Sequence, residues 1–442
     1  MNVVAAVETE ALAKRPIVWP VAQRIAFRFC FVYFTLFCFS SQIITTLLPI
    51  PKVDIPDLDT LPPFRAITFW VAAHVFRLKP PLVYSGSGSG DKTFDWVTLF
   101  CIAVVAVAAT AGWSWLDRRR SHYVVLYSWF WLFLRICLAG QMLVYGFAKA
   151  VPLQMARPLL FTLTEPFGNF SPMGVLWSSI GAAQSYEIFA GCAELTGAFL
   201  LMFPRTATLG ALVALADLIQ VFLLNMTYDV PVKLLSFHLI LMSLVLLGPN
   251  LGRLADFFVR YRSTYPATPV ILPLHSNRAF RIAAIAQVVL WLWIIGNSLY
   301  GDWEAWHQFG AGRAKPPLYG IWDVDQLTVD GKLQPPLLTD NDRWRRIIFD
   351  FPNFVQIQLM DDSRKSYGAN VDDKEKTLTL TRPDDKNWKA SFTYVRPAGD
   401  QLTLDGTMAG HNVRIQLKRE DETRFLLNSR GFHWIQDYPF NR

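Results

Sequence analysis

Ionisable side chains lie within four apolar stretches of this chain, at positions that a helix facing lipid would not tolerate. The stretches fall between Trp129 and Leu247. They carry Arg135, Glu187, Glu194, Asp217, Lys233 and His238. A charge at the centre of a bilayer costs at least about 2.5–3.5 kcal/mol on insertion scales. These side chains are therefore expected to face one another, a polar cavity or a ligand, and the site that they form is the best guide to function.

The depth of each side chain can be predicted if the stretches are helices of alternating direction, with a rise of about 1.5 Å per residue. Two polar layers result, an outer one and a deeper one. The outer layer holds Lys149, Glu187, Asp229 and Lys233, and the deeper layer holds Arg135, Glu194, Asp217 and His238. Opposite charges at one depth can neutralise each other. Two interpretations stay open: a polar pocket that opens outward and binds a headgroup or relays protons, or ion pairs that hold four helices together.

Helix-length apolar runs dominate the chain that must position these residues. Of its 442 residues, 52% are hydrophobic and 14% aromatic. A membrane span needs roughly 20 apolar residues, and about seven runs meet that length. They lie near 24–48, 95–116, 124–149, 183–203, 206–226, 231–248 and 280–300. The first run is expected to be a retained span, because no small-residue cleavage pattern follows it. The pattern predicts a polytopic α-helical membrane protein.

Basic residues in the short loops predict the orientation of these spans. The groups are Lys14, Arg15, Arg24 and Arg28, then Arg118, Arg119 and Arg120, then Arg205, and finally Arg253, Arg260, Arg262, Arg278 and Arg281. All fall on one side of the membrane if the N-terminus is cytoplasmic, as the positive-inside rule prefers. The loop 49–94 is also rich in lysine and arginine, which weakens this signal. With an odd number of spans, everything after Tyr300 lies outside the cytoplasm, and we expect the protein in the inner (plasma) membrane of a bacterium.

From about Leu318 the apolar residues recur at every second position, which indicates β-strands. Around eight short strands joined by tight turns predict an exported, antiparallel β-barrel-like domain in the periplasm. The start of the first strand, Gly320-Ile-Trp322, is similar to the G-x-W start of lipocalin-like barrels. A barrel of this size holds one small ligand or is filled with side chains, and we favour the filled or partly filled version.

Five regions follow from these patterns. They are a two-span region at 1–123 with an external loop at 49–94, a four-helix core at 124–250, a basic cytoplasmic linker at 251–279, a last span at 280–300 and an extracytoplasmic β-rich domain at 301–442. A further external segment, 151–184, is expected to fold back over the helices.

Sequence motifs for common cofactors do not occur in the chain. The cysteines lie in apolar runs without a C-x-x-C pair and are expected to be inert thiols. The chain offers no second intramembrane histidine for haem, no cysteine set for an iron–sulfur cluster and no nucleotide fingerprint. The run SGSGSGDKT fits neither phosphate-binding template and predicts a flexible connector. The net charge of +7 comes mostly from the loops and the chain after residue 300 is close to balanced, so no nucleic-acid partner is expected. No metal site is expected either.

A resemblance to a known family rests on the third to sixth runs. Arg135, Gly140, Gly146, Lys149 and Glu194, with the later turn YDVPVK, are similar to the motif positions of the DoxX family. Its members are four-span bundles, named for a subunit of an archaeal quinol oxidase and thiosulfate:quinone oxidoreductase. The resemblance covers about Tyr127 to Gly248. The flanking spans and the ending FLLNSRGFHWIQDYPFNR resemble long, uncharacterised bacterial proteins labelled DoxX-like. The family shares a fold, so function follows from it only loosely.

Three functional hypotheses from different classes result. The first is an accessory component of a membrane redox system that binds a quinone headgroup near His238, Lys233 and Glu187 in an outward-facing pocket. The second is a non-enzymatic scaffold whose exported β domain binds an envelope protein or lipid. The third is a proton-coupled transporter that uses Glu194, Asp217 and Arg135, although no inverted repeat is present. Whether the protein is an enzyme stays open, and the expected partners are the bilayer and another membrane or envelope protein.

Overall fold

The computed structural model describes residues 18–48, 55–79, 81–264, 270, 272–274, 276–385 and 387–441. The chain divides into two compact units. The helical unit comprises Met1–Ala150 and Phe189–Gly301, and the barrel unit comprises Val151–Ile188 and Asp302–Arg442. The predicted orientation residues Lys14 and Arg15, and the start of the external loop at 49–54, lie outside the described residues.

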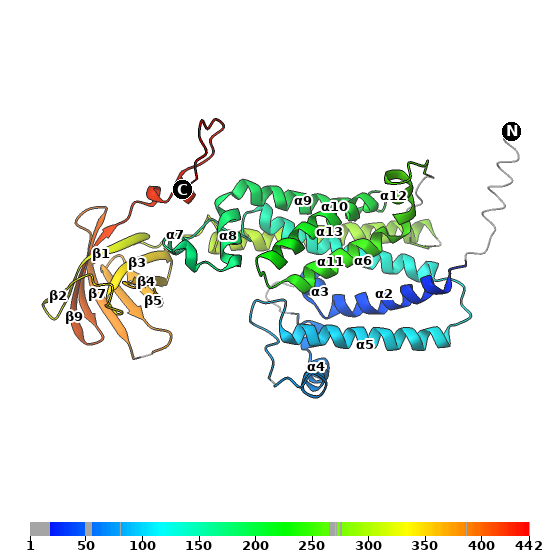
Figure 1. The fold of residues 1–442 in the computed structure, drawn as a ribbon, viewed down its shortest axis with the longest axis horizontal. Coiled ribbons are helices and arrows are strands. Elements are labelled where there is room, and N and C mark those ends of the chain that lie inside the picture. Colours follow the sequence, from blue (N-terminus) through cyan, green and yellow to red (C-terminus); the bar gives the residue numbers. More distant parts are fainter. Residues whose placement is uncertain are drawn as a thin grey trace. The chain divides into compact units, whose positions relative to one another are not determined.

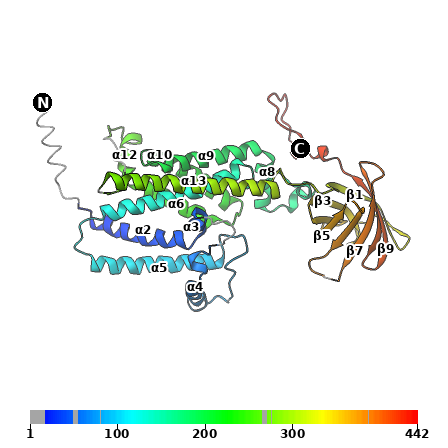
Figure 2. The ribbon, with the colours of Figure 1, turned by 180° about the vertical axis from the view of Figure 1, so that it is seen from behind.

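Six helices in the described part of the chain are long and apolar enough to cross a membrane. They are α2 (Val21–Phe39), α5 (Thr93–Leu116), α6 (Val124–Ala150), α10 (Ala207–Thr227), α11 (Lys233–Leu247, continuous with a span to Phe258) and α13 (Asn277–Gln308). Figures 1 and 2 show them side by side. The prediction of a polytopic helical membrane protein is confirmed at this level.

Two of the predicted spans differ from the structure. The run at 24–48 is not one helix: α2 ends at Phe39 and α3 (Gln42–Leu47) begins after a break. At the break the Ser41 hydroxyl donates a hydrogen bond to the Phe37 carbonyl at 2.8 Å, a local contact that competes with helix propagation. The run at 183–203 forms α9 (Gln184–Met202), which carries two glutamates and is not among the six helices.

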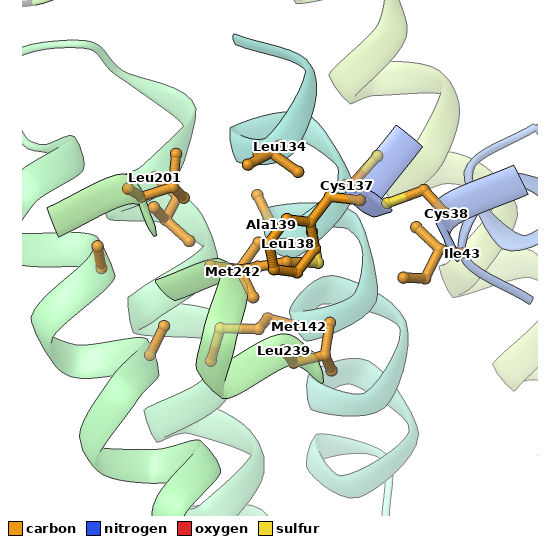
Figure 3. Packing of buried hydrophobic residues seen from close by; sticks show 14 of the residues in the cluster. Cys38, Ile43, Leu134, Cys137, Leu138, Ala139, Met142, Leu201, Leu239 and Met242 are labelled. Atoms are coloured by element: carbon orange, nitrogen blue, oxygen red, sulfur yellow. The ribbon is translucent and has the colours of Figure 1, made fainter. Parts of the chain in front are cut away.

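Helix α6 forms the centre of the helical unit. Two-thirds of its most apolar window is buried, compared with about a tenth of that of α13. Figure 3 shows Leu138 and Met142 of this helix packed against apolar side chains from other helices, including Met242 of α11. Cys38 and Cys137 are fully buried in the same cluster as free thiols. Shorter helices complete the unit: α4 (Pro62–His74) and α12 (Leu251–Phe258), with the 3-10 turns η1 (Leu58–Thr60) and η3 (Gly248–Asn250).

The barrel unit contains nine antiparallel strands (Figure 2). They are β1 (Gly320–Val329), β2 (Lys332–Gln334), β3 (Trp344–Phe351), β4 (Phe354–Leu359), β5 (Arg364–Asp372), β6 (Thr377–Thr381), β7 (Lys389–Val395), β8 (Gln401–Met408) and β9 (His411–Arg419). From β3 to β9 each strand pairs with the next one in sequence. The short strand β2 pairs antiparallel with the end of β1, and β1 also pairs with β3. Pairing of β1 with β9 closes eight strands into a barrel, which confirms the predicted antiparallel barrel.

Apolar side chains fill the barrel interior. Trp322, Ile357 and Leu380 are fully buried within one cluster that draws on every strand except β2. The indole nitrogen of Trp322 donates to the Leu318 carbonyl at 2.8 Å, so its only polar atom is satisfied. This packing matches the filled version of the barrel.

The segment 151–188, which contains the segment predicted to fold back over the helices, belongs to the barrel unit. It contains α7 (Leu160–Leu163), α8 (Pro172–Ala182) and the turn η2 (Phe167–Asn169). The buried carboxylate of Asp350 on β3 accepts a hydrogen bond from the Leu160 backbone N–H at 2.7 Å and is paired with Arg313. Arg364 forms an ion pair with Glu165 at 2.8 Å. These contacts hold the segment against the barrel. Separating them would leave the buried carboxylate of Asp350 without its hydrogen bond from Leu160, which is costly.

Candidate functional site

Lys149 and Glu194 form a buried ion pair in the helical unit. The Lys149 Nζ lies 2.5 Å from Glu194 Oε1, and their side chains are only 8% and 5% exposed. Lys149 is in the last turn of α6 and Glu194 is in the middle of α9. The sequence placed them in different layers, so this pair joins the two predicted layers. The pairing supports the expectation that opposite charges in these helices neutralise each other.

Two glycines let α6 and α9 approach closely enough for this pair. A Cβ on Gly191 would lie 2.5 Å from the Ala150 nitrogen and 2.7 Å from the Gly146 carbonyl oxygen. A Cβ on Gly146 would lie 2.9 Å from Leu195 Cγ. Small residues at such contacts are how membrane helices bring their backbones together. The close approach places Glu194, one turn beyond Gly191, against Lys149.

Asp217 on α10 adds a second carboxylate beside the pair. The charges of Glu194 and Lys149 both act on it. Its Oδ2 atom is buried and has no hydrogen-bond partner among the described residues. Two carboxylates therefore lie near one lysine in this part of the bundle. Their negative charge exceeds the positive charge of the lysine by one, and a proton or another cation would balance it.

His238 on α11 is held by its neighbours and offers no free nitrogen. Its Nδ1 lies 2.6 Å from the Leu234 carbonyl oxygen, which can only accept, so Nδ1 carries the proton. Its Nε2 lies 2.8 Å from the Tyr33 hydroxyl, and its ring stacks on Phe37 with the ring centres 3.8 Å apart. The side chain is 2% exposed. The predicted quinone contact at His238 has no geometric support.

The other members of the predicted outer layer have partners of their own within each unit. Glu187 belongs to the barrel unit, where its Oε1 accepts a hydrogen bond from the Met155 backbone N–H at 2.8 Å. Lys233 pairs with Asp229 at 2.9 Å, and the Asp229 side chain is 83% exposed. Asp91, from the predicted connector, accepts hydrogen bonds from the backbone N–H groups of Lys233 and Leu234, both at 2.8 Å, and so caps the start of α11.

A polar cavity of about 360 Å³ lies beside these residues, at the end of the helical unit where α5 and α11 begin. We call it the acidic pocket. Its polar lining consists of Ser40, Ser41, Gln42, Asp57, Asp59, Thr60, Tyr84, Ser89, Lys92, Asp95, Thr98 and Tyr145, and its apolar lining includes Phe37, Leu99, Ile102, Val232, Leu234 and Leu235. Polar and apolar walls of this kind suit a ligand with a ring and a few polar groups.

The start of α5 supplies an ion pair at the pocket. Lys92 Nζ lies 2.9 Å from Asp95 Oδ2, and the Lys92 backbone N–H donates to the same oxygen at 2.9 Å. Lys92 also donates to the Ser89 carbonyl at 2.8 Å. A carboxylate in the first turn is favoured by the helix dipole, so the sequence KTFD both begins α5 and fixes this pair.

Asp59 in η1 is the carboxyl group without a partner. It is 7% exposed, and its Oδ1 has no hydrogen-bond partner among the described residues. Burial, together with the negative charges of Asp57 and Asp95, raises the pKa of Asp59 to about 7. Burial also raises the pKa of Asp57, against a hydrogen bond from Thr45 at 3.2 Å. The pocket therefore holds a carboxyl group that changes charge near neutral pH.

Tyr145 connects the acidic pocket with the buried pair. Its hydroxyl accepts a hydrogen bond from Gln42 Nε2 at 2.7 Å, and the Lys149 Nζ lies 5.7 Å from the centre of its ring. The pocket and the Lys149–Glu194 pair thus meet across one aromatic side chain.

Sequence reasoning missed the carboxylates of this pocket. Asp57, Asp59 and Asp95 lie in or beside the loop 49–94, where the proline-rich stretch is acidic but shows no period. The one available signal was the recurrence of aspartates on both sides of the connector. Among the described residues no group of three or more His, Cys, Asp or Glu is arranged to hold a metal ion.

Arg135 lies near the middle of α6, away from the residues with which it was grouped. Its Nη2 donates to Gln287 Oε1 of α13 at 3.0 Å, and its guanidinium lies 5.3 Å from the Trp131 ring. No ion pair joins it to Glu194, Asp217 or any other described acidic residue.

Comparison with known proteins gives one informative relative. The chain is 34% identical over 124 residues to the uncharacterized protein YwoB of Bacillus subtilis (strain 168), a match that covers 28% of this chain and 79% of the relative. No family model matches the chain. No solved structure matches it.

Proposed function

The chain belongs to the family of the uncharacterized Bacillus subtilis protein YwoB, and we propose that it is an integral membrane protein whose acidic pocket binds the headgroup of a membrane quinol. The observation that carries the proposal is the buried carboxyl group of Asp59, whose Oδ1 has no hydrogen-bond partner among the described residues and which lines a cavity of about 360 Å³. In this role the protein is an accessory component of a membrane redox system.

The chemistry of the lining favours the reduced form of such a ligand. A quinol carries two hydroxyl groups, which donate hydrogen bonds, and ionised carboxylates only accept them. Asp57 and Asp59 are acceptors at the pocket, while Phe37 and Tyr145 offer ring surfaces. A quinone has no hydroxyl donor and would face these carboxylates with its own carbonyl oxygens, so it is expected to bind more weakly.

The acidity of Asp59 suits a proton acceptor. A group whose pKa lies near the working pH can take up and release a proton most effectively. Oxidation of a quinol releases two protons and two electrons, and Asp59, at about pH 7, could receive one of these protons. The electrons must pass to a partner protein, because the sequence carries no motif for haem, iron–sulfur or nucleotide binding.

The proposal includes a DoxX-like four-helix core formed by α6, α9, α10 and α11. If α9 is a seventh crossing, a cytoplasmic N-terminus places the acidic pocket and the β-barrel outside the cytoplasm of a bacterial cell. Basic loops at 118–120 and 253–262 support this orientation.

Titration of the purified full chain in lipid nanodiscs tests this function. We expect decylubiquinol to quench tryptophan fluorescence saturably, and decylubiquinone to bind more weakly. Asp59→Asn should weaken quinol binding about ten-fold, which is the loss of one charge-assisted hydrogen bond. Asp229→Asn is the matched control, because that carboxylate is 83% exposed and does not line the pocket. Equal affinities of the two variants, or no binding by the wild type, would exclude the pocket as a quinol site.

A second candidate function, the scaffold, is favoured by one observation. In the C-terminal tail the side chains of Phe432, Trp434 and Tyr438 are all more than 80% exposed. Exposed aromatic groups of this kind are typical of contacts with a membrane surface or a protein. Capture of envelope proteins by the wild type but not by a Trp434→Ala, Tyr438→Ala variant would support this role, and equal capture would argue against it.

A further inference from the structure

Arg135 is a buried arginine that the protein leaves largely without hydrogen bonds. It is 1% exposed, yet only its Nη2 has a partner, the side-chain oxygen of Gln287. Its Nε and Nη1 atoms are buried and have no partner among the described residues. Most of the N–H donors of the guanidinium are therefore unused, and its positive charge is not neutralised by a described acidic side chain.

Arg28 shows how the same unit treats a structural arginine. This side chain is 3% exposed, similar to Arg135. Its Nε donates to the Tyr123 hydroxyl at 3.0 Å, its Nη1 to Ser114 at 2.8 Å and its Nη2 to the Asp117 carbonyl at 3.0 Å. All three nitrogens are satisfied. The difference between these two buried arginines indicates that Arg135 binds a group that does not belong to the chain.

A separate cavity of about 140 Å³ lies against Arg135. Its polar lining is Ser128, Trp131, Arg135 and Gln287, and none of its described lining side chains is acidic. At roughly 30 Å³ per water in the liquid, the space suits a few waters or one carboxylate or phosphate group. The remaining walls are apolar, contributed by residues such as Leu132 and Phe280.

We propose that Arg135 and this cavity bind an oxyanion, a carboxylate or phosphate group. An unpaired charge in a low-dielectric interior costs several kcal/mol, and an anion in the cavity would remove that cost. A guanidinium binds carboxylate and phosphate groups in a bidentate manner, and the Nε and Nη1 donors of Arg135 have no partner among the described residues. This site goes beyond the proposed quinol site, since Arg135 near the middle of α6 and Tyr145 near its end are about 15 Å apart along the helix.

Binding measurements on the full chain in phosphatidylcholine nanodiscs test the site. One arm titrates inorganic phosphate, and a second arm adds phosphatidic acid or oleate to the lipid, so the arms separate a free anion from a lipid-borne one. The readout is the shift of the thermal unfolding midpoint, which grows with the concentration of any ligand that binds the folded state. We expect a shift in at least one arm.

The variants assign the shift to Arg135. Arg135→Met should weaken anion binding by at least about ten-fold, and Arg135→Lys, which keeps the charge but loses the planar fork, should weaken it less. Arg28→Lys is the control, because it changes an equally buried arginine outside the cavity and should leave the anion affinity unchanged. If Arg135→Met fails to fold, Arg135→Lys still decides. No shift of the wild type in either arm, or unchanged affinity of the Arg135 variants, would overturn the proposal.

Discussion

The two units of this protein bury polar groups in different ways. The barrel surrounds an interior of apolar side chains, and its buried Asp350 is satisfied by Arg313 and the Leu160 N–H. The helical unit buries Lys149 with Glu194 in its interior, and atoms of Asp59 and Arg135 beside its cavities have no described partner. Buried atoms without a described partner also occur in the barrel unit, for example at Arg343 and Gln358. Unsatisfied buried groups are costly to stability, so their place in a protein points to ligands.

The physical origin of this difference is the environment around each unit. Strands with period two place apolar residues inside the barrel and polar residues in water. Helices that cross a membrane face lipid on the outside, so their polar residues must lie inside. The acidic pocket and the cavity at Arg135, on which both proposals rest, belong to the helical unit, whereas the barrel interior is filled with apolar side chains.

The largest expected effect comes from breaking the buried pair. Lys149→Met should destabilise the helical unit by about 3–5 kcal/mol, because it leaves Glu194 charged and buried. The double variant Lys149→Met, Glu194→Gln should recover much of the loss. Thermal unfolding in detergent, followed by circular dichroism, measures both. A single variant as stable as the wild type would show that the pair does not hold these helices.

The acidic pocket predicts a pH dependence of stability. Between about pH 4 and 7, folded Asp59 keeps a proton that the unfolded chain releases, so its contribution falls as pH rises through this window and stays low above pH 7. Asp59→Asn should therefore stabilise the ligand-free protein above pH 7, by at most about 4 kcal/mol, and change little near pH 4. Unfolding midpoints measured from pH 4 to 8 test this. Parallel pH profiles of the two proteins would contradict the raised pKa.

The smallest effect is expected in the barrel. Ile357→Val removes one methylene from its filled interior and should cost about 0.5–1.5 kcal/mol. Quinol and phosphate binding by the helical unit should be unchanged, because this residue lies in neither cavity. Altered ligand affinity in this variant would show that ligand binding by the helical unit depends on the barrel.

The amount that could be predicted differs between fold and site. Long apolar runs predicted the six membrane-type helices, and alternation predicted the closed barrel, because both patterns repeat over many residues. The site was predicted only in part. Lys149 and Glu194 were both predicted to belong to the polar site, but in different layers and not as partners of each other. Their contact depends on the close approach at Gly191, which no periodicity reveals.

By itself the sequence determined that charged side chains must be enclosed by membrane helices and that a β-barrel follows them. Lipid tolerates no unpaired charge, and strand alternation allows few other arrangements. Only the tertiary structure decided which charges meet and which remain open. Asp59 faces a cavity because a loop without periodicity packs against the start of α5, and Arg135 meets Gln287 from a helix more than a hundred residues away. Such contacts depend on the packing of residues far apart in the sequence, which local residue patterns do not predict.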